Sequence, residues 1–184
     1  MDSQEIIKSL LVHLTLIGTG LVLVWGSYLN LVATKTIKLR YRFKDQYFLI
    51  FVYLVAMIAT LGSLFYSEVA GYEPCKLCWY QRILMYPQAI LYMVALAKND
   101  MKVGVYGVAL SVVGGAIALY HYLQQIGVIT ASVCGLVGFS VSCSQRFSTS
   151  YGYITIPMMA LIAFLLIILA WWAYWLQLKN RISK

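Results

Sequence analysis

Charged residues are scarce in this chain. They make up 11% of its 184 residues, and only six are Asp or Glu, whereas 62% of the residues are apolar. So little polar surface cannot cover a water-soluble globule of this size. An intrinsically disordered chain is also excluded, because such chains are poor in aromatic residues and this one has 15 Tyr, 7 Phe and 5 Trp. The composition therefore indicates an integral membrane protein.

The apolar residues fall into five long stretches that contain no Asp, Glu or Lys. A helix needs about 20 apolar residues to span roughly 30 Å of hydrocarbon, and each stretch is close to that length or longer. The stretches are residues 9–33, 47–67, 79–97, 103–124 and 153–176. We therefore expect an all-α integral membrane protein, with a four-helix transmembrane bundle preceded by one additional N-terminal transmembrane helix.

The basic residues predict how these spans are oriented. Ten of the 14 Lys and Arg residues fall in segments 34–46, 98–102 and 177–184, which lie on one side of the predicted membrane. The positive-inside rule places that side in the cytoplasm. The N-terminus is then expected outside and the C-terminus inside, with segments 68–78 and 125–152 on the outer face. The net charge of +8 is interpreted as a feature of topology, and nucleic acid is not expected as a partner.

The chain is expected to divide at its basic linker. Residues 1–46 would hold the additional span and the linker, and residues 47–184 the four-helix domain. A cleavable signal peptide is the alternative for the first span. It is less favoured, because the segment before this span contains Asp2, Glu5 and Lys8 and so is not basic, and because the apolar stretch is longer than in a typical signal peptide.

The four cysteines form two pairs in segments expected on the outer face, where disulfides persist. Cys75 and Cys78 form a Cys-x-x-Cys sequence just before the third span, so their sulfurs can meet across one helical turn. The unpaired amides of a helix start stabilise a thiolate, and so small a ring favours an exchangeable bond. Cys134 and Cys143 lie in the longest outer segment. Redox exchange is favoured, with structural disulfides and a four-cysteine zinc site as alternatives.

Two polar residues within the predicted spans are candidates for acting with the first pair. Arg82 follows Cys78 by four positions, which places it one turn deeper on the same helix face. It could extend toward the lipid headgroups, or it could stabilise negative charge beside Cys78. His121 lies in the fourth span near its outer end. It could form an interhelical hydrogen bond, or it could serve as a hydrogen-bond donor and proton carrier.

Residues 73–82, Glu-Pro-Cys-Lys-Leu-Cys-Trp-Tyr-Gln-Arg, resemble the disulfide-bond formation protein B family, and most closely its short Gram-positive branch, BdbC. Residues 59–68, 121–125 and 152–157 resemble the same branch, so the likeness extends over about residues 47–175. It implies an up-and-down four-helix bundle in the cytoplasmic membrane. It also implies a thiol oxidase that re-oxidises an extracytoplasmic thioredoxin-fold thiol oxidase, of the DsbA or BdbD type, and passes two electrons to a membrane quinone.

The resemblance also implies roles for particular residues. They are the catalytic cysteines Cys75, Cys78, Cys134 and Cys143 and the quinone-associated residues Arg82 and His121. Cys75 and Cys78 would form the quinone-side pair, with Cys78 next to the ring between the third and fourth spans. Cys134 and Cys143 would exchange with the partner, starting at Cys134. Menaquinone is implied by the Gram-positive branch, with ubiquinone as the other choice, and no metal is expected.

The additional N-terminal span departs from the four-span pattern of the family, so its role stays open. Two other functions also stay open. One is an enzyme similar to vitamin-K-epoxide reductase, in which the tight cysteine pair begins the last helix of the bundle. Here that pair begins an earlier helix. The other is a membrane scaffold or assembly protein whose disulfides are structural.

Overall fold

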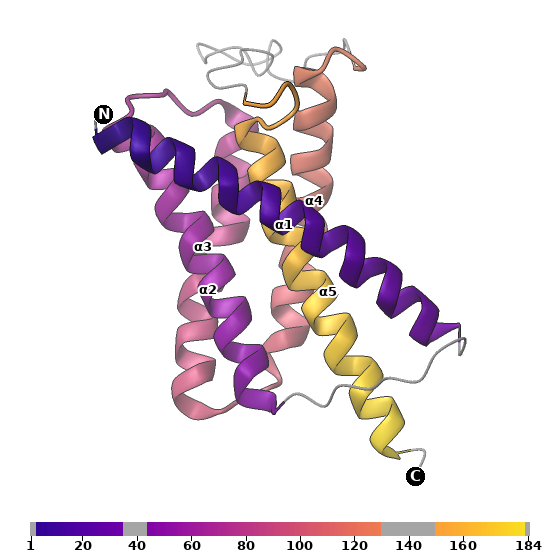
Figure 1. Cartoon of the computed structure of the whole chain (residues 1–184). Coiled ribbons are helices and arrows are strands. Elements are labelled where there is room, and N and C mark those ends of the chain that lie inside the picture. Colours follow the sequence, from indigo (N-terminus) through magenta and orange to yellow (C-terminus); the bar gives the residue numbers. More distant parts are fainter. Residues whose placement is uncertain (1–2, 35–43, 130–149, 183–184) are drawn as a thin grey trace.

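The computed structural model describes residues 3–34, 44–129 and 150–182, and each regular element in these ranges is a helix. The elements are α1 (Ser3–Ala33), α2 (Asp45–Leu64), the short π-helix η1 (Phe65–Val69), α3 (Lys76–Lys98), α4 (Val103–Gln125) and α5 (Ile156–Ile182). Each predicted span overlaps one helix, and the second span is α2 extended by η1. The expectation of an all-helical chain is confirmed for the described residues (Figure 1).

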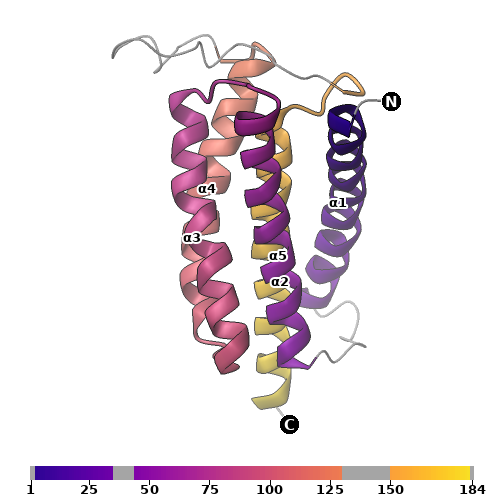
Figure 2. The same cartoon turned by 90° about the vertical axis from the view of Figure 1, so that its left-hand side faces the viewer.

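Helices α2 to α5 form an antiparallel four-helix bundle. Each packs against its two neighbours: α2 against α3, α3 against α4, α4 against α5, and α5 against α2. Figure 2 shows α3 and α4 together beside α2 and α5. The core between them is apolar and includes Val52, Tyr92, Ala118 and Phe164, one from each helix. This arrangement brings the start of α3, the end of α4 and the start of α5 to the same end of the bundle (Figure 1).

Glycines allow α4 to approach its neighbours closely. The ring of Phe164 on α5 fills the place where a Cβ atom at Gly114 would lie, and the hydroxyl group of Tyr92 on α3 does so at Gly107. Small residues permit this close packing between membrane helices. These contacts hold α4 against both α3 and α5, and they thereby hold the end of α4 that carries His121.

Helix α1 lies outside the bundle and crosses it obliquely (Figures 1 and 2). Its C-terminal half shares a buried apolar cluster with α5. Trp25 contacts Phe51 of α2 edge to face, with ring centroids 5.8 Å apart. Gly18 faces α5 so closely that a Cβ atom there would lie 2.8 Å from Cγ2 of Ile162. The helix predicted as an additional span is therefore attached to the α2 and α5 side of the bundle.

Four of the described helices are long and apolar enough to cross a membrane, namely α1, α2 with η1, α4 and α5. Helix α3 is not one of them, although its 23 residues make it about 35 Å long. Its hydropathy is lowered by polar side chains such as Gln81, Arg82 and Gln88, of which both glutamines are buried. The four apolar helices indicate a multi-pass membrane protein. The fifth span and the orientation in the membrane stay predictions.

Candidate active site

The Cys75-Lys76-Leu77-Cys78 sequence forms the start of α3. Cys75 is the N-cap residue, and its sulfur accepts a hydrogen bond from the Cys78 amide over 3.4 Å. The two sulfurs lie 3.1 Å apart as free thiols, as their spacing predicts. The unpaired amides and the positive end of the helix dipole favour negative charge here. The start of α3 therefore holds a dithiol in which Cys75 is the better placed of the two sulfurs to carry charge.

His121, near the end of α4, supports Cys75 from the side. Its side chain is 1% exposed, and its Nε2 atom lies 3.6 Å from the Cys75 sulfur. On the other side of the ring, Nδ1 lies 3.0 Å from Nε2 of Gln81. An amide nitrogen can only donate, so Nδ1 must accept, and the neutral imidazole carries its proton on Nε2. Gln81 thus orients His121 to donate a hydrogen bond to the Cys75 sulfur.

These contacts lower the pKa of the Cys75 thiol below its ordinary value. The largest cause is the hydrogen bond from the Cys78 side chain, and the hydrogen bond with His121 adds to it. Burial acts in the opposite direction but is outweighed. With its pKa lowered to about 4, the Cys75 thiol is a thiolate at neutral pH, and the thiolate is the form that takes part in disulfide exchange.

We expect replacement of His121 by Phe to raise the pKa of Cys75, because the donor on Nε2 is lost. The thiolate fraction should then fall as the pH drops through the raised pKa, whereas wild-type Cys75 stays ionised. The measurement is the rate of Cys75 alkylation by iodoacetamide between pH 5 and 9, quantified by peptide mass spectrometry. Gln81→Leu should give a smaller change in the same direction. Tyr122→Phe, one residue further along α4, is the control, and a His121→Phe profile identical to wild type would refute the assignment.

Arg82 is tied to α2 within the bundle. Its Nε atom donates to Oγ of Ser63 over 3.1 Å, and its Nη2 atom donates to the Ser63 carbonyl over 3.2 Å. Tyr86 donates to the same Ser63 hydroxyl over 3.1 Å. The guanidinium also lies over the Trp79 ring, 5.3 Å from its centroid. Two hydrogen bonds and a ring contact hold the guanidinium in place. An Arg82 side chain extended toward the lipid headgroups would not need these contacts.

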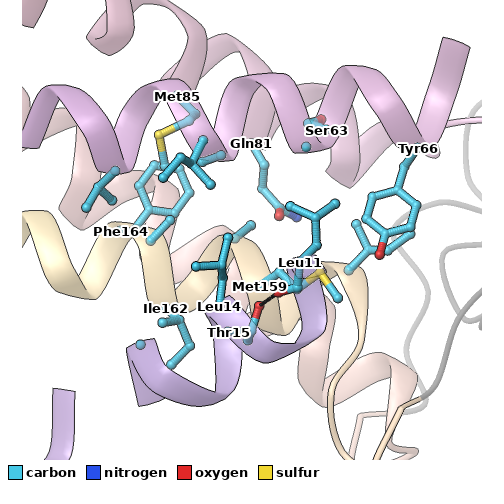
Figure 3. Close-up of a pocket in the computed structure, with 18 of the residues that line it drawn as sticks. Leu11, Leu14, Thr15, Ser63, Tyr66, Gln81, Met85, Met159, Ile162 and Phe164 are labelled. Carbon is cyan, nitrogen blue, oxygen red and sulfur yellow. Dashed lines mark hydrogen bonds between the residues drawn. The ribbon is translucent and has the colours of Figure 1, made fainter. Parts of the chain in front are cut away.

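A pocket of about 300 Å³ borders Cys78 of the pair. Cys78, Gln81, Arg82 and Ser63 line it, together with residues of α1, α2 and α5. Figure 3 shows Gln81 and Ser63 with lining residues of these helices. Its described lining includes no residue of α4. A ligand was expected between the outer ends of the third and fourth spans, whereas this pocket lies between α3 and the α1, α2 and α5 side.

Tyr66 lines the same pocket. It lies in η1, it is 4% exposed, and its ring stacks on Tyr72 at a centroid distance of 5.9 Å. Its hydroxyl group is buried and has no hydrogen-bond partner among the described residues. Buried hydroxyl groups in proteins are almost always paired, and π-helical turns are frequent at functional sites. Tyr66 therefore lines the pocket, while its hydroxyl oxygen lies beneath the pocket surface.

The remaining predicted site residues, Cys134 and Cys143, lie outside the described residues, so their exchange role stays a prediction. The structure does bring together three groups that could ligate a metal. The ligand atoms of Cys75, Cys78 and His121 lie within 4.8 Å of one another. Two thiolates and an imidazole suit Zn²⁺, so the reduced pair could bind such an ion in competition with disulfide formation.

Sequence reasoning placed Arg82 and His121 near the cysteine pair but missed the residues that position them. Gln81 orients His121, and Ser63 anchors Arg82. One available signal was that Gln81 is a polar residue inside an apolar stretch and follows Cys78 by three positions. Ser63 gave a weaker signal, because a small hydroxyl residue is common where membrane helices pack.

Comparison with known proteins identifies the family. The family described as "Disulfide bond formation protein DsbB" matches residues 45–176. The "Probable disulfide formation protein" of Oceanobacillus iheyensis is 44% identical over 124 residues, which are 67% of this chain and 86% of the relative. "Disulfide bond formation protein C" of Bacillus subtilis is 42% identical over 127 residues, which are 66% of this chain and 88% of the relative. No solved structure gives a significant match. The chain therefore belongs to the DsbB family of disulfide bond formation proteins, as the motif at residues 73–82 predicts.

Proposed function

We propose that this protein is a membrane thiol:quinone oxidoreductase that re-oxidises a thioredoxin-fold thiol oxidase on the outer face of the cytoplasmic membrane. Membership in the family implies thiol oxidation and an oxidoreductase activity. The observation that carries the proposal further is the position of Cys78. Its sulfur lies 3.1 Å from that of Cys75 and also borders a pocket lined by Arg82. The pair can therefore exchange disulfides with protein thiols at Cys75 and pass electrons to an acceptor in the pocket next to Cys78.

The pocket residues fit a quinone. A quinone ring needs hydrogen-bond donors or positive charge at its oxygens, and the pocket offers the Arg82 guanidinium. When bound, the quinone would supply an acceptor for two electrons and two protons. Arg82 would hold one of its oxygens, and the apolar side chains of the lining would exclude water. Menaquinone is the proposed species, with ubiquinone as the other choice.

The proposed exchange begins at the second pair of cysteines. A thiolate of the reduced partner attacks Cys134 and breaks the Cys134–Cys143 disulfide, and the second partner thiol then closes the partner's own disulfide. The reduced loop pair next attacks the Cys75–Cys78 disulfide at Cys75, and Cys78 leaves as a thiolate. When the loop disulfide re-forms, Cys75 and Cys78 hold the two electrons. Each step exchanges one disulfide for another, so the thiols are conserved until the electrons leave the last pair.

The residues around Cys75 support the last step. The reduced pair must lose two electrons and two protons to close its disulfide again. His121 and the Cys78 amide hold Cys75 as a thiolate, so one of the two protons has already left. Arg82 stabilises negative charge near Cys78. Electrons flow from the cysteine pair to the quinone if the quinone has the higher reduction potential. For a two-electron transfer, each difference of about 30 mV corresponds to about 1.4 kcal/mol.

The test uses the full-length protein purified in detergent, with a reduced thioredoxin-fold oxidase and menaquinone. The expected result is one partner disulfide formed for each quinone reduced, followed by quinone absorbance and by thiol titration. Partner oxidation without quinone consumption would refute the proposal. The tight pair begins α3, not the last helix as in vitamin-K-epoxide reductase, and its cysteines are free thiols beside a histidine, which a structural disulfide would not need.

A further inference from the structure

We propose that α1 forms one wall of the pocket and binds the isoprenoid tail of the quinone. The inference rests on the proposed function and deepens it, because it names the part of the ligand that this helix recognises. The family match covers residues 45–176, so α1 (Ser3–Ala33) lies wholly outside it. The proposal therefore concerns a feature that the family match does not account for.

The N-terminal half of α1 faces the pocket along one stripe. Leu11, Leu14, Gly18 and Leu21 all line the pocket, and their spacing of three and four residues is that of a single helix face. Figure 3 shows Leu11 and Leu14 on the opposite side of the pocket from Gln81. Without α1, the cysteine pair and Arg82 would border an open face of the bundle.

The position of this wall is fixed by close contacts at two glycines. A Cβ atom at Gly18 of α1 would lie 2.8 Å from Ile162 of α5. A Cβ atom at Gly62 of α2 would lie 3.1 Å from Leu11 of α1. These contacts hold α1 against α5 and α2 while the space between them remains open. The pocket is thus a packed feature of the fold and not a gap left by a loosely attached helix.

The chemistry of the lining divides the pocket in two. The end next to Cys78 is polar and contains Gln81, Arg82 and Ser63. The rest is lined by apolar side chains of α1, α2 and α5, such as Leu14 and Phe51. A ligand with a polar ring and a long apolar chain matches this division, and a small polar substrate does not. The ring belongs at the Cys78 end, and the tail belongs against α1.

Two pocket-lining residues of α1 also reach the outside of the fold. Leu14 and Ile17 line the pocket and are 38% and 61% exposed. They lie on α1, a helix apolar enough to cross a membrane, so we expect their exposed surface to face lipid. A polyprenyl chain can therefore enter and leave sideways from the bilayer while its ring stays near the cysteine pair.

The experiment compares two threonines of α1 that differ in their relation to the pocket and in burial, since Thr15 is buried and Thr19 is half-buried. Thr15 lines the pocket and Thr19 is outside its lining, and each hydroxyl bonds to the carbonyl four residues before it. Thr15→Phe should fill the tail path, and Thr19→Phe is the matched control. Binding of polyprenyl menaquinone and of menadione, which has the same ring without the tail, is measured by quenching of tryptophan fluorescence in the full-length protein. Circular dichroism checks that both variants are folded.

We expect Thr15→Phe to weaken the binding of polyprenyl menaquinone about tenfold, the loss that follows when about two buried methylene groups lose their contacts. Its binding of menadione should be unchanged, and Thr19→Phe should change neither. Equal effects of the two variants, while the wild type binds both quinones, would overturn this inference alone. A wild-type protein that binds neither quinone would overturn the proposed function as well.

A second measurement does not depend on any variant. Menaquinone that carries a photoreactive diazirine on its tail is irradiated with the wild-type protein, and the labelled peptides are identified by mass spectrometry. Label within residues 3–34 that unlabelled menaquinone suppresses is the expected result. No label in α1, or label that phospholipid vesicles suppress equally well, would show that the tail does not occupy this wall and would overturn the inference.

Discussion

Replacement of Cys78 by Ser is expected to abolish quinone reduction, a loss of roughly a thousandfold or more. Serine cannot form a disulfide with Cys75, so the pair can no longer hold two electrons beside the pocket. The rate is measured as quinone reduction by the purified protein with a reduced thioredoxin-fold partner. Tyr80→Phe, two residues further along α3 with a half-exposed side chain, should retain activity and is the control.

The two cysteines should also fail in different ways. In Cys78→Ser the remaining Cys75 thiolate can attack the Cys134–Cys143 disulfide and release one of its two sulfurs as a thiolate. We therefore expect a mixed disulfide between Cys75 and the loop pair to accumulate and to be detected by peptide mass spectrometry under non-reducing conditions. Cys75→Ser removes the attacking thiolate, so no such species should form through Cys78, although quinone reduction is lost as well. A Cys78→Ser protein with full activity would rule out the proposed electron path.

Replacement of Arg82 by Met is expected to raise the KM for quinone by about 10- to 100-fold. Hydrogen bonds to charged groups contribute about 1.5–3 kcal/mol, and each 1.4 kcal/mol corresponds to about tenfold in binding. Met fills a similar volume but has no charge, so the quinone oxygens and the Cys78 thiolate lose their cationic neighbour. Steady-state kinetics with varied quinone concentration provides the measurement.

Two further variants separate the charge of Arg82 from its position. Ser63→Ala removes the hydroxyl that accepts from Nε of Arg82 but keeps the cation, so a smaller rise in KM is expected. Arg82→Lys keeps the charge but loses the two-point contact with Ser63, so its effect should fall between the other two. An unchanged KM in Arg82→Met would show that the guanidinium serves packing alone.

The helices could be predicted from the sequence because the bilayer sets their length. An apolar stretch as long as residues 103–124 is expected to span the bilayer as a helix, and α4 occupies nearly the same residues. Whether α3 spans the membrane was harder to judge from hydropathy, because the polar residues that lower its hydropathy are those that form the site. Gln81 and Arg82 have partners on α4 and α2. A hydropathy pattern cannot show such partners, because they depend on which helices are neighbours.

The site was predictable in its sulfur chemistry and less so in its arrangement. The spacing of Cys75 and Cys78 and the helix that follows them predict a reactive pair at a helix start. Whether His121 faces the cysteines or a ligand depends on the rotation of α4 about its axis, which close packing at glycines fixes. The additional N-terminal helix carries no motif, so only its packing shows that it borders the pocket.

The atom that caps α3 is also an atom that gains and loses electrons. While Cys75 is a thiolate, it is a strong acceptor for the Cys78 amide and completes the first turn of the helix. Once Cys75 is bonded to the other sulfur it carries no charge, and it accepts that amide only weakly. The order of this turn therefore follows the oxidation state, and hydrogen exchange at the Cys78 amide should be faster in the oxidised protein than in the reduced one.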